Sequence, residues 1–156
     1  MYLTSTAIPA DSTIDIRHAE PGVGGANVAP DLEWGDVPAG TKSFLVTCFD
    51  PDAPTGSGWW HWVVADIPAA VTALPEGGAL PEGARTWPTD YGYPNWGGPW
   101  PPPGQPAHHY HFRVAALDVD RLEVPDDTTR ANALLTASFH VLGEAEFVAL
   151  FQNPAS

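Results

Sequence analysis

Residues 43–67 read SFLVTCFDPDAPTGSGWWHWVVADI, and no other stretch says more about the fold. Ser43 to Asp50 is rich in β-formers and nearly all apolar, which predicts a central strand buried on both faces. Trp59 to Ile67 has the same character and predicts a second strand. The loop between them holds prolines and glycines, which end strands and shape turns. The sequence therefore predicts a sheet built outward from this segment.

Further strands are predicted on either side of it. Two are His109 to Leu117 and Glu146 to Phe151, and further candidates lie at residues 3–8, 13–17 and 32–34. The chain carries 18 prolines and 15 glycines beside an ordinary apolar fraction of 44%. This combination favours an all-β class of short strands joined by shaped loops over a helical bundle.

One helix is predicted after the N-cap candidates at residues 126–128, Asp-Asp-Thr, whose acidic groups complement the helix dipole. Its apolar positions run from Ala131 to Phe139, and Gly143 is the predicted stop. A second, shorter helical turn is expected at residues 69–74.

The net charge of the chain is −13, from 19 acidic and 6 basic residues. Such a surface repels nucleic acids and anionic lipid headgroups, so we expect no nucleic-acid partner. One small anion in a walled pocket is still compatible with this charge, provided that a few well-placed donors hold it. By length, residues 1–156 are expected to form one domain.

Cys48 is the only cysteine and lies in an apolar run, so we interpret it as a small buried hydrophobe. A chain with one cysteine forms no internal disulfide, which suits a reducing compartment. Met1 to Thr6 lacks the regions of a signal peptide. No run reaches the roughly 18 to 20 apolar residues that span a bilayer. We therefore expect a cytoplasmic protein without integral membrane association.

Two carboxylates and a histidine flank the loop of the opening stretch. Asp50 and Asp52 surround a proline at the exit of the buried strand, and His61 follows among tryptophans. Strand alternation predicts that His61 shares a face with Trp59 and Val63. A carboxylate partner would restore the charged form of a histidine in apolar surroundings. The alternative is that the carboxylates cap the turn and the histidine is a satisfied core residue.

A second polar group follows the proline-rich segment Gly98 to Gly104, which favours a stiff polyproline rim. Alternation places His108 and Tyr110 on one strand face and His109 and His111 on the other. Ring N–H and phenolic O–H groups are the donors that an oxyanion requires. We expect His108 and Tyr110 to face a pocket shared with the first group.

The stretch between these groups, residues 75–106, is expected to be an ordered loop that walls the pocket, because long loops inside compact domains are usually functional. Trp96 and Trp100 within it are candidate exposed anchors for a protein partner, with packing inside the loop as the alternative.

A metal centre is a further use of the same side chains. His61, His108 and Asp50 fit a two-histidine, one-carboxylate triad, and the His109 and His111 spacing suits zinc or nickel. The sequence has no HExxH motif, no paired CxxC motif and no GxSxG elbow. We therefore predict neither a metal nor another cofactor.

With these residues in view, the chain resembles the phosphatidylethanolamine-binding protein family, and within it the bacterial Raf-kinase-inhibitor-like branch. The resemblance covers almost the whole chain, and its two main signatures stand far apart in the expected order. The matching segments are Asn27-Val28-Ala29-Pro30 with Leu32 and Trp34, residues 37–43, Asp50-Pro51-Asp52-Ala53-Pro54, Trp60-His61-Trp62, Thr89-Asp90-Tyr91-Gly92, Gly98 to Gly104, and His108-x-Tyr110.

The resemblance implies a β-sandwich with a large central sheet, a smaller sheet, one or two short peripheral helices and a shallow cavity that binds phosphate-like or carboxylate-like anions. It also makes Ala53–Pro54 a candidate cis peptide. Carried over by motif, the ligand-binding residues are Asp50, Asp52, Trp60, His61, Pro101, Pro102, His108 and Tyr110.

Three positions depart from the family pattern. His109 stands where many relatives carry Arg, Pro103 stands where Lys is frequent, and Ala29 replaces a serine. The histidine weakens the expectation of a basic rim. Because the surface is acidic and no membrane-seeking helix is expected, we do not transfer the phospholipid and kinase partners of eukaryotic relatives.

The function expected from these observations is the binding of a small anionic or phosphorylated ligand. Asp50 would orient His61 or His108 and stabilise its imidazolium, so that the ring and Tyr110 donate to the ligand's oxygens. One alternative is an isomerase, cyclase or hydrolase that uses the same four residues for proton transfer. Because the family is not generally catalytic, we prefer binding to catalysis. Another alternative is inhibition of a kinase or protease through the pocket rim, and homodimerisation is compatible with the sequence.

Overall fold

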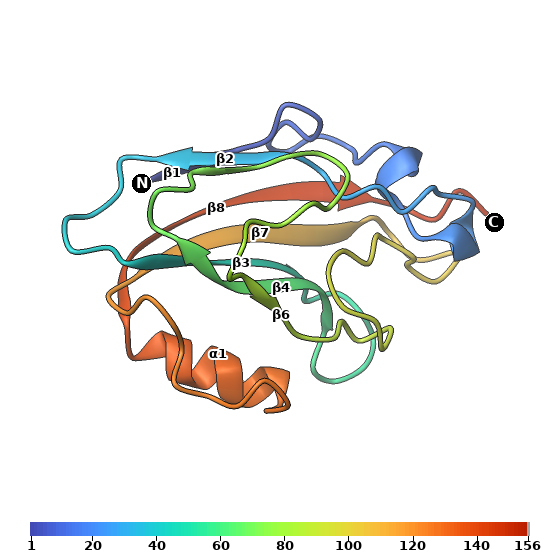
Figure 1. Cartoon of the computed structure of the whole chain (residues 1–156). Coiled ribbons are helices and arrows are strands. Elements are labelled where there is room, and N and C mark those ends of the chain that lie inside the picture. The colour runs from blue at the N-terminus through green and yellow to red at the C-terminus, as the bar shows by residue number, and fades with distance from the viewer. Residues whose placement is uncertain (156) are drawn as a thin grey trace.

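Eight strands form two sheets that pack face to face in the computed structural model, which describes residues 1–155 (Figure 1). The larger sheet has the order β6-β4-β3-β7-β8 and the smaller one the order β1-β2-β5, with all neighbours antiparallel. The strands are β1 (Tyr2–Thr4), β2 (Leu32–Gly35), β3 (Ser43–Asp50), β4 (Trp59–Pro68), β5 (Ala73–Leu74), β6 (Arg85–Thr86), β7 (His108–Leu117) and β8 (Val141–Phe151). The predicted sandwich of a large central sheet and a smaller sheet is confirmed.

Strand β3 lies in the middle of the large sheet, as its continuous apolar pattern predicts. It pairs with β4 on one side and β7 on the other, and all but one of its residues are buried. Cys48 is among them, and burial raises the pKa of its thiol, in keeping with its interpretation as a buried hydrophobe. The end of this strand, Asp50, is thereby fixed between two long neighbours.

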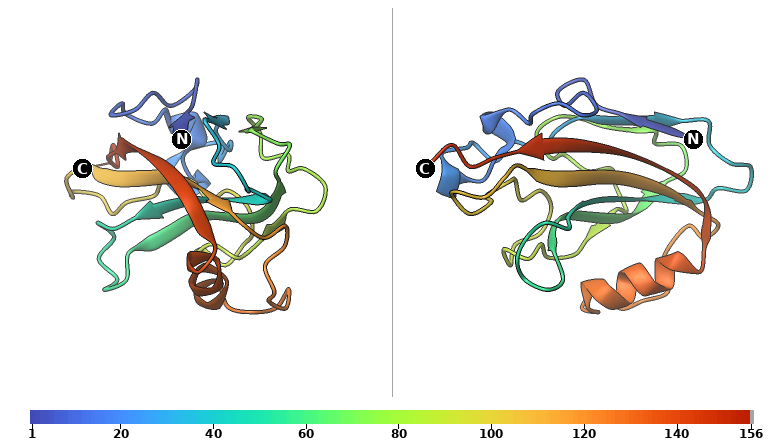
Figure 2. Two further views of the ribbon diagram at one scale, coloured as in Figure 1. Left: turned by 90° about the vertical axis from the view of Figure 1, so that its left-hand side faces the viewer. Right: turned by 180° about the vertical axis from the view of Figure 1, so that it is seen from behind.

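The large sheet has a core on each face. The core against the small sheet contains Trp34, Phe44, Trp62 and Phe112, and Trp34 contacts Phe44 edge to face. The other core lies under helix α1 (Arg130–Ser138), which covers one end of the opposite face (Figure 2). The site therefore depends on a sheet that is held from both sides.

Helix α1 begins later and ends earlier than predicted. Its N-cap is Thr129, whose side chain accepts from the Asn132 N–H, whereas residues 126–128 form a preceding turn. The helix ends at Ser138 because the chain turns into β8, so the predicted stop at Gly143 is wrong: Gly143 lies inside that strand. Strand β8 accordingly begins at Val141, before the predicted start at Glu146.

Several short segments also differ from expectation. Residues 69–74 form a turn followed by β5, not a helical turn, because Leu74 adds to the edge of the small sheet. Of the residues 13–17, Thr13 makes one isolated bridge and Ile16 begins a short 3-10 turn, η1 (Ile16–His18). A second such turn, η2 (Pro21–Val23), follows it. The candidate cis peptide Ala53–Pro54 is trans. Among residues 1–155, no helix has the length and apolar character of a membrane span.

Candidate functional site

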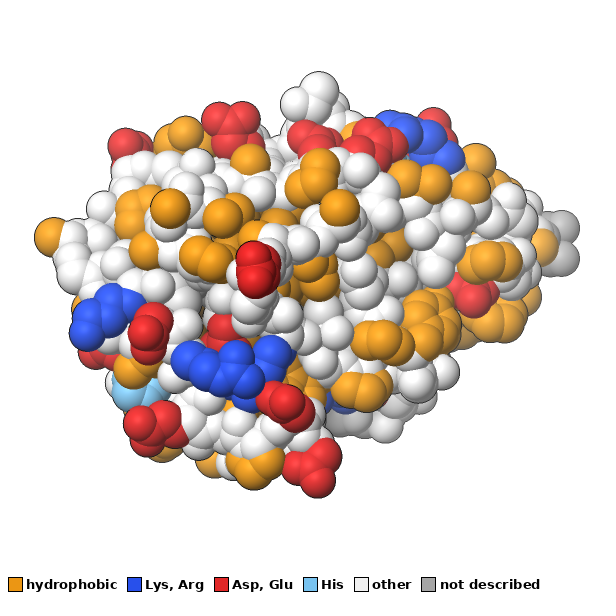
Figure 3. Space-filling view, in the orientation of Figure 1, with side chains coloured by type: hydrophobic (Ala, Val, Ile, Leu, Met, Phe, Trp, Pro, Cys, Tyr) orange, Lys and Arg blue, Asp and Glu red, His pale blue; other side chains and the backbone are white. Residues whose placement is uncertain are grey.

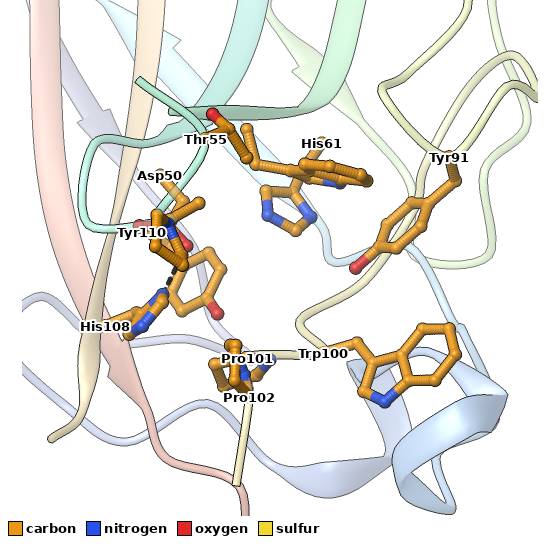
Figure 4. Close-up of a pocket in the computed structure, with 12 residues that line it drawn as sticks. Asp50, Thr55, His61, Tyr91, Trp100, Pro101, Pro102, His108 and Tyr110 are labelled. Atoms are coloured by element: carbon orange, nitrogen blue, oxygen red, sulfur yellow. Dashed lines mark hydrogen bonds and ion pairs between the residues drawn. The ribbon is translucent and has the colours of Figure 1, made fainter. Parts of the chain in front are cut away.

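The β3–β4 loop and the long loop before β7 come together at one end of the sandwich (Figure 1). Residues of both loops line a pocket there. Its volume is about 300 Å³, at the lower end of the range for small-ligand sites. Figure 4 shows polar groups from β3, β4 and β7 on one side and the proline-rich loop on the other. The lining residues are Asp50, Ala53, Pro54, Thr55, Trp59, His61, Tyr91, Trp100, Pro101, Pro102, His108 and Tyr110.

Strand alternation in β7 places two of these side chains in the pocket. His108 and Tyr110 are buried on the inner face, whereas His109 is exposed and His111 half-buried on the outer face, as the sequence predicts. The outer histidines pair with carboxylates, His109 with Asp52 and His111 with Glu146. These two histidines therefore bind carboxylates outside the pocket and do not line it.

A β-bulge in β4 sets the position of His61. Cys48 of β3 pairs with Trp62 and the next residue, Phe49, pairs with Trp60, so His61 is an extra residue in β4. A bulge of this kind lets two consecutive side chains occupy the same face of a sheet. His61 reaches the pocket and Trp62 enters the inter-sheet core beside it.

Two expectations about β4 are wrong. Because of the bulge, Val63 packs in the helix-side core and does not share a face with His61. Trp60 alternates with His61 and lies on that outer face, where its ring packs at a tilt against Phe49 with ring centroids 4.4 Å apart, so it is not a pocket wall. Trp59, one residue earlier, lines the pocket instead.

Asp50 and His108 form the central ion pair of the pocket. His108 Nδ1 lies 2.6 Å from Asp50 Oδ2, and both side chains are almost fully buried. The other carboxylate oxygen accepts the Asp52 N–H at 2.8 Å, which closes the turn after β3. His108 Nε2 lies 2.6 Å from Gln105 Oε1. Nδ1 therefore donates to the Asp50 carboxylate, and Nε2 pairs with the side-chain amide of Gln105.

His61 differs from His108 in that it has no carboxylate partner. Its Nδ1 donates to the Gly97 carbonyl oxygen at 2.6 Å, and the ring packs edge to face against Tyr91 and Tyr110. Burial lowers the pKa of His61 to about 4, although the Gly97 carbonyl and the charge of Asp50 act to raise it. The ring is therefore neutral at physiological pH.

Two buried donors of the pocket have no protein partner. Of the five buried, unpaired polar side-chain atoms within residues 1–155, the Tyr110 hydroxyl and the Trp59 Nε1 belong to pocket-lining residues. Figure 4 shows the Tyr110 oxygen directed toward Pro101 and Pro102. Burial, followed by the charge of Asp50, raises the pKa of Tyr110, so the hydroxyl remains a donor.

Asp52 lies outside the pocket, contrary to the motif-based expectation. Its Oδ2 accepts both the backbone N–H and the ring N–H of His109, each at 2.7 Å. Partial burial acts to raise its pKa, but the hydrogen bonds from His109 outweigh this, so the pKa of Asp52 lies below its ordinary value. Asp52 is therefore a support that joins the β3–β4 loop to β7.

Aromatic side chains that the sequence reasoning did not assign form the far wall. Tyr91 stacks on Tyr93 with centroids 5.6 Å apart, lies beside Trp100 at 6.4 Å, and donates from its hydroxyl to the Gly98 carbonyl. Trp59 contacts Tyr91 edge to face. The alternation of β4 already places Trp59 with His61, whereas Tyr91 and Gln105 lie in loops that carry no periodic signal.

Of the two tryptophans proposed as exposed anchors, one is buried. Trp96 packs between Trp62 and Phe112, and its ring N–H donates to the His18 carbonyl at 3.0 Å. Trp100 remains 48% exposed at the mouth of the pocket. The packing alternative therefore holds for Trp96.

The pocket lining contains neither Lys nor Arg. Within residues 1–155, all five arginines form ion pairs with carboxylates. Figure 3 shows basic side chains beside acidic ones on the visible face. The same view shows hydrophobic side chains gathered toward the loop end of the molecule. Among the described residues that line the pocket, Asp50 is the one carboxylate, and it is paired with His108.

Comparisons with known proteins agree on one family. The family model described as phosphatidylethanolamine-binding protein matches residues 4–152. The Escherichia coli K12 protein YbhB is 44% identical over 97% of this chain and 99% of its own length. The crystal structure of E. coli YbcL, described as a member of the mammalian PEBP family, superposes with a TM-score of 0.91 at 41% identity and 97% coverage of both chains. A Chlamydia trachomatis homologue, CT736, superposes with a TM-score of 0.84 at 28% identity, covering 97% of this chain and 96% of its own.

Proposed function

This chain belongs to the phosphatidylethanolamine-binding protein family, and from the chemistry of its pocket we propose that it binds a small oxyanion of the phosphate or carboxylate type. The observation that carries the proposal is the Tyr110 hydroxyl, which is buried beside the Asp50–His108 pair without a protein partner. An unpaired buried hydroxyl costs about 1–3 kcal/mol. A ligand oxygen at this point would recover that free energy.

A second donor supports the same ligand chemistry. Trp59 Nε1 is also buried without a partner and belongs to the pocket lining. Two neutral donors that converge on a small pocket suit an acceptor group with several oxygens. The hydroxyl and the indole would together orient one tetrahedral or planar anion.

In this proposal the ligand anion binds the imidazolium form of His108, which lies beside these donors. Asp50 fixes the ring from Nδ1, and the Gln105 side chain contacts Nε2. A ligand oxygen that displaces Gln105 would receive a charge-assisted hydrogen bond, which is about twice as strong as a neutral one. In this scheme Asp50 orients His108, while the Gly97 carbonyl orients His61.

The walls limit the rest of the ligand. Pro101 and Pro102 lack backbone N–H groups and therefore offer no competing donors. Tyr91 and Trp100 present ring surfaces at the opening. The pocket thus suits a compact ligand with one oxyanion and a small apolar remainder.

The test is isothermal titration calorimetry with inorganic phosphate on the wild type, Tyr110→Phe and His108→Ala. Tyr2→Phe, a half-exposed tyrosine in β1, is the matched control. A lost hydrogen bond to a charged group corresponds to affinity about tenfold or more weaker for each pocket variant. Equal affinity in the wild type and both pocket variants would refute the site.

A further inference from the structure

The pocket offers one acceptor beside its donors. Because a carbonyl oxygen only accepts, the hydrogen bond from His61 to Gly97 places the ring proton on Nδ1. In a neutral ring, Nε2 then carries a lone pair. Figure 4 shows the nitrogen-bearing edge of His61 turned toward the cavity. Within residues 1–155 the ring makes one hydrogen bond of good geometry, from Nδ1, and the Gly98 carbonyl, which accepts from the Tyr91 hydroxyl, also lies near enough to act to raise the pKa of the ring.

The surroundings of His61 keep this lone pair available. The ring is 2% exposed and lies between Tyr110 of β7 and Tyr91 of the long loop. Burial outweighs the carboxylates of Asp50 and Asp90, which act to raise the pKa of His61. The Asp50 carboxylate is itself paired with His108.

The balance of charge disfavours a doubly charged ligand. Asp50 and His108 offset each other, and no Lys or Arg lines the pocket. A dianion would enter a site without net positive charge. An oxyanion with no proton would also set an oxygen lone pair against His61 Nε2, and the bound ligand would then shield two acceptors from water without pairing them.

A ligand that keeps one proton satisfies every group. Its O–H donates to His61 Nε2, and its other oxygens accept from Tyr110 and Trp59. We propose that the pocket selects a tetrahedral oxyacid that retains one proton, such as a phosphomonoester monoanion or an alkylphosphonate monoanion, over oxyanions without a proton. This proposal rests on the anion binding proposed above and adds which protonation state is bound, with His61 as the residue that determines it.

The experiment compares two ligands of similar shape and equal charge. Methylphosphonate monoanion and methanesulfonate are titrated calorimetrically into the wild-type protein at about pH 5, below the second pKa of phosphate-type groups at about 6. Methylphosphonate should bind about tenfold or more tightly, since only its proton pairs the His61 Nε2 acceptor that either ligand would shield from water. Its affinity should then fall as the pH rises and the second proton dissociates.

Two variants test whether His61 causes the difference in affinity between the two ligands. His61→Gln can turn an amide N–H toward the ligand, so the ratio between the two affinities should fall toward one. Tyr110→Phe removes a donor that both ligands use, so it should weaken both by similar factors and leave the ratio unchanged. If His61→Gln does not fold, the wild-type ratio and its pH dependence still decide the question.

The outcomes separate this inference from the proposed function. If methanesulfonate binds as tightly as methylphosphonate, or more tightly, the selection of a proton is wrong while anion binding stands. If neither ligand binds, both proposals are wrong. A ratio of about ten or more in the wild type that is lost in His61→Gln supports both.

Discussion

The two inward-facing histidines of the pocket have different partners. His108 donates from Nδ1 to the Asp50 carboxylate and contacts Gln105 through Nε2, whereas His61 donates only to a backbone carbonyl. A carboxylate partner stabilises the imidazolium, while burial without one disfavours it. The same residue type therefore stands beside a carboxylate at one point of the pocket and is a neutral acceptor at another.

His61 should make folding stability depend on pH. Its pKa is about 4 in the folded chain against an ordinary 6.5, so the unfolded state binds the proton more readily. The contribution of neutral His61 to the free energy of unfolding is fully present above about pH 6.5 and is lost as the pH falls toward 4. The loss from this one residue amounts to up to about 3 kcal/mol.

Urea unfolding at several pH values measures this effect in the wild type and in His61→Gln. The variant should lose less stability than the wild type between neutral and acidic pH. Buried His18, whose pKa is also lowered by burial, contributes to both proteins and cancels in the comparison. Identical pH profiles would contradict the neutral state of His61.

For single residues, the sequence predicts which side chains meet in the pocket better than it predicts their hydrogen-bond partners. Alternation in one strand places His108 and Tyr110 on the inner face, and Asp50 stands at the end of the neighbouring strand. Which histidine Asp50 orients depends on the register between β3 and β7, which alternation does not encode. Gln105 was missed because it lies in a loop and acts through a single contact.

Among the elements, the β3–β4 unit determines the geometry of the pocket. Alternation in β4 places Trp59 and His61 inward and Trp60 outward, and the bulge at His61 then turns Val63 to the outer face. A bulge adds one residue without changing the local composition. For this reason the two-residue period predicts the strand correctly and misplaces Val63.

The loop that joins β3 to β4 provides a matched pair of glycines. Gly56 and Gly58 both have positive φ, 81° and 68°. A Cβ on Gly58 would lie 2.7 Å from the Asp50 carbonyl oxygen and closer still to the Phe49 ring, whereas one on Gly56 meets nothing within 4 Å. Gly58→Ala should therefore destabilise the protein by about 1–3 kcal/mol more than Gly56→Ala. Denaturant unfolding of both variants checks this, and equal losses would contradict the close approach.

Across the whole molecule, a partly buried arginine connects the large sheet to the segment before α1. Arg85 of β6 donates to the Leu122 and Val124 carbonyls at 2.7 and 2.8 Å and pairs with the buried carboxylate of Asp66. Removing it would leave Asp66 buried with only Arg121, at 3.7 Å, as an ionic partner.

We expect Arg85→Met to lower the free energy of unfolding by about 3 kcal/mol, because a buried charge loses its partner. Arg113→Met breaks the more exposed pair with Glu144 on the same sheet and should cost less than about 1 kcal/mol. Urea titration of the two variants measures the difference. A loss at Arg113 as large as that at Arg85 would show that burial does not govern these pairs.

The sandwich architecture follows from composition and motif, whereas its fine boundaries do not. The apolar run of β3 and the breakers around it predict a central strand between loops. The N-cap of α1 is Thr129, not the acidic residues before it, because those residues form the preceding turn, and Asp126 pairs with Arg85 and Arg121. Such choices depend on tertiary contacts between distant segments.

The central claim is that one pocket, built from β3, β4 and β7, receives an oxyanion between Tyr110, Trp59 and the two inward histidines. An NMR titration with inorganic phosphate tests it most directly, with the Trp59 indole N–H and the ring nitrogens of His61 and His108 as reporters. These signals should shift together and saturate along one binding curve, while the outer His109 and His111 stay unchanged. Saturable shifts confined to the outer face, or none at high phosphate concentration, would contradict the account.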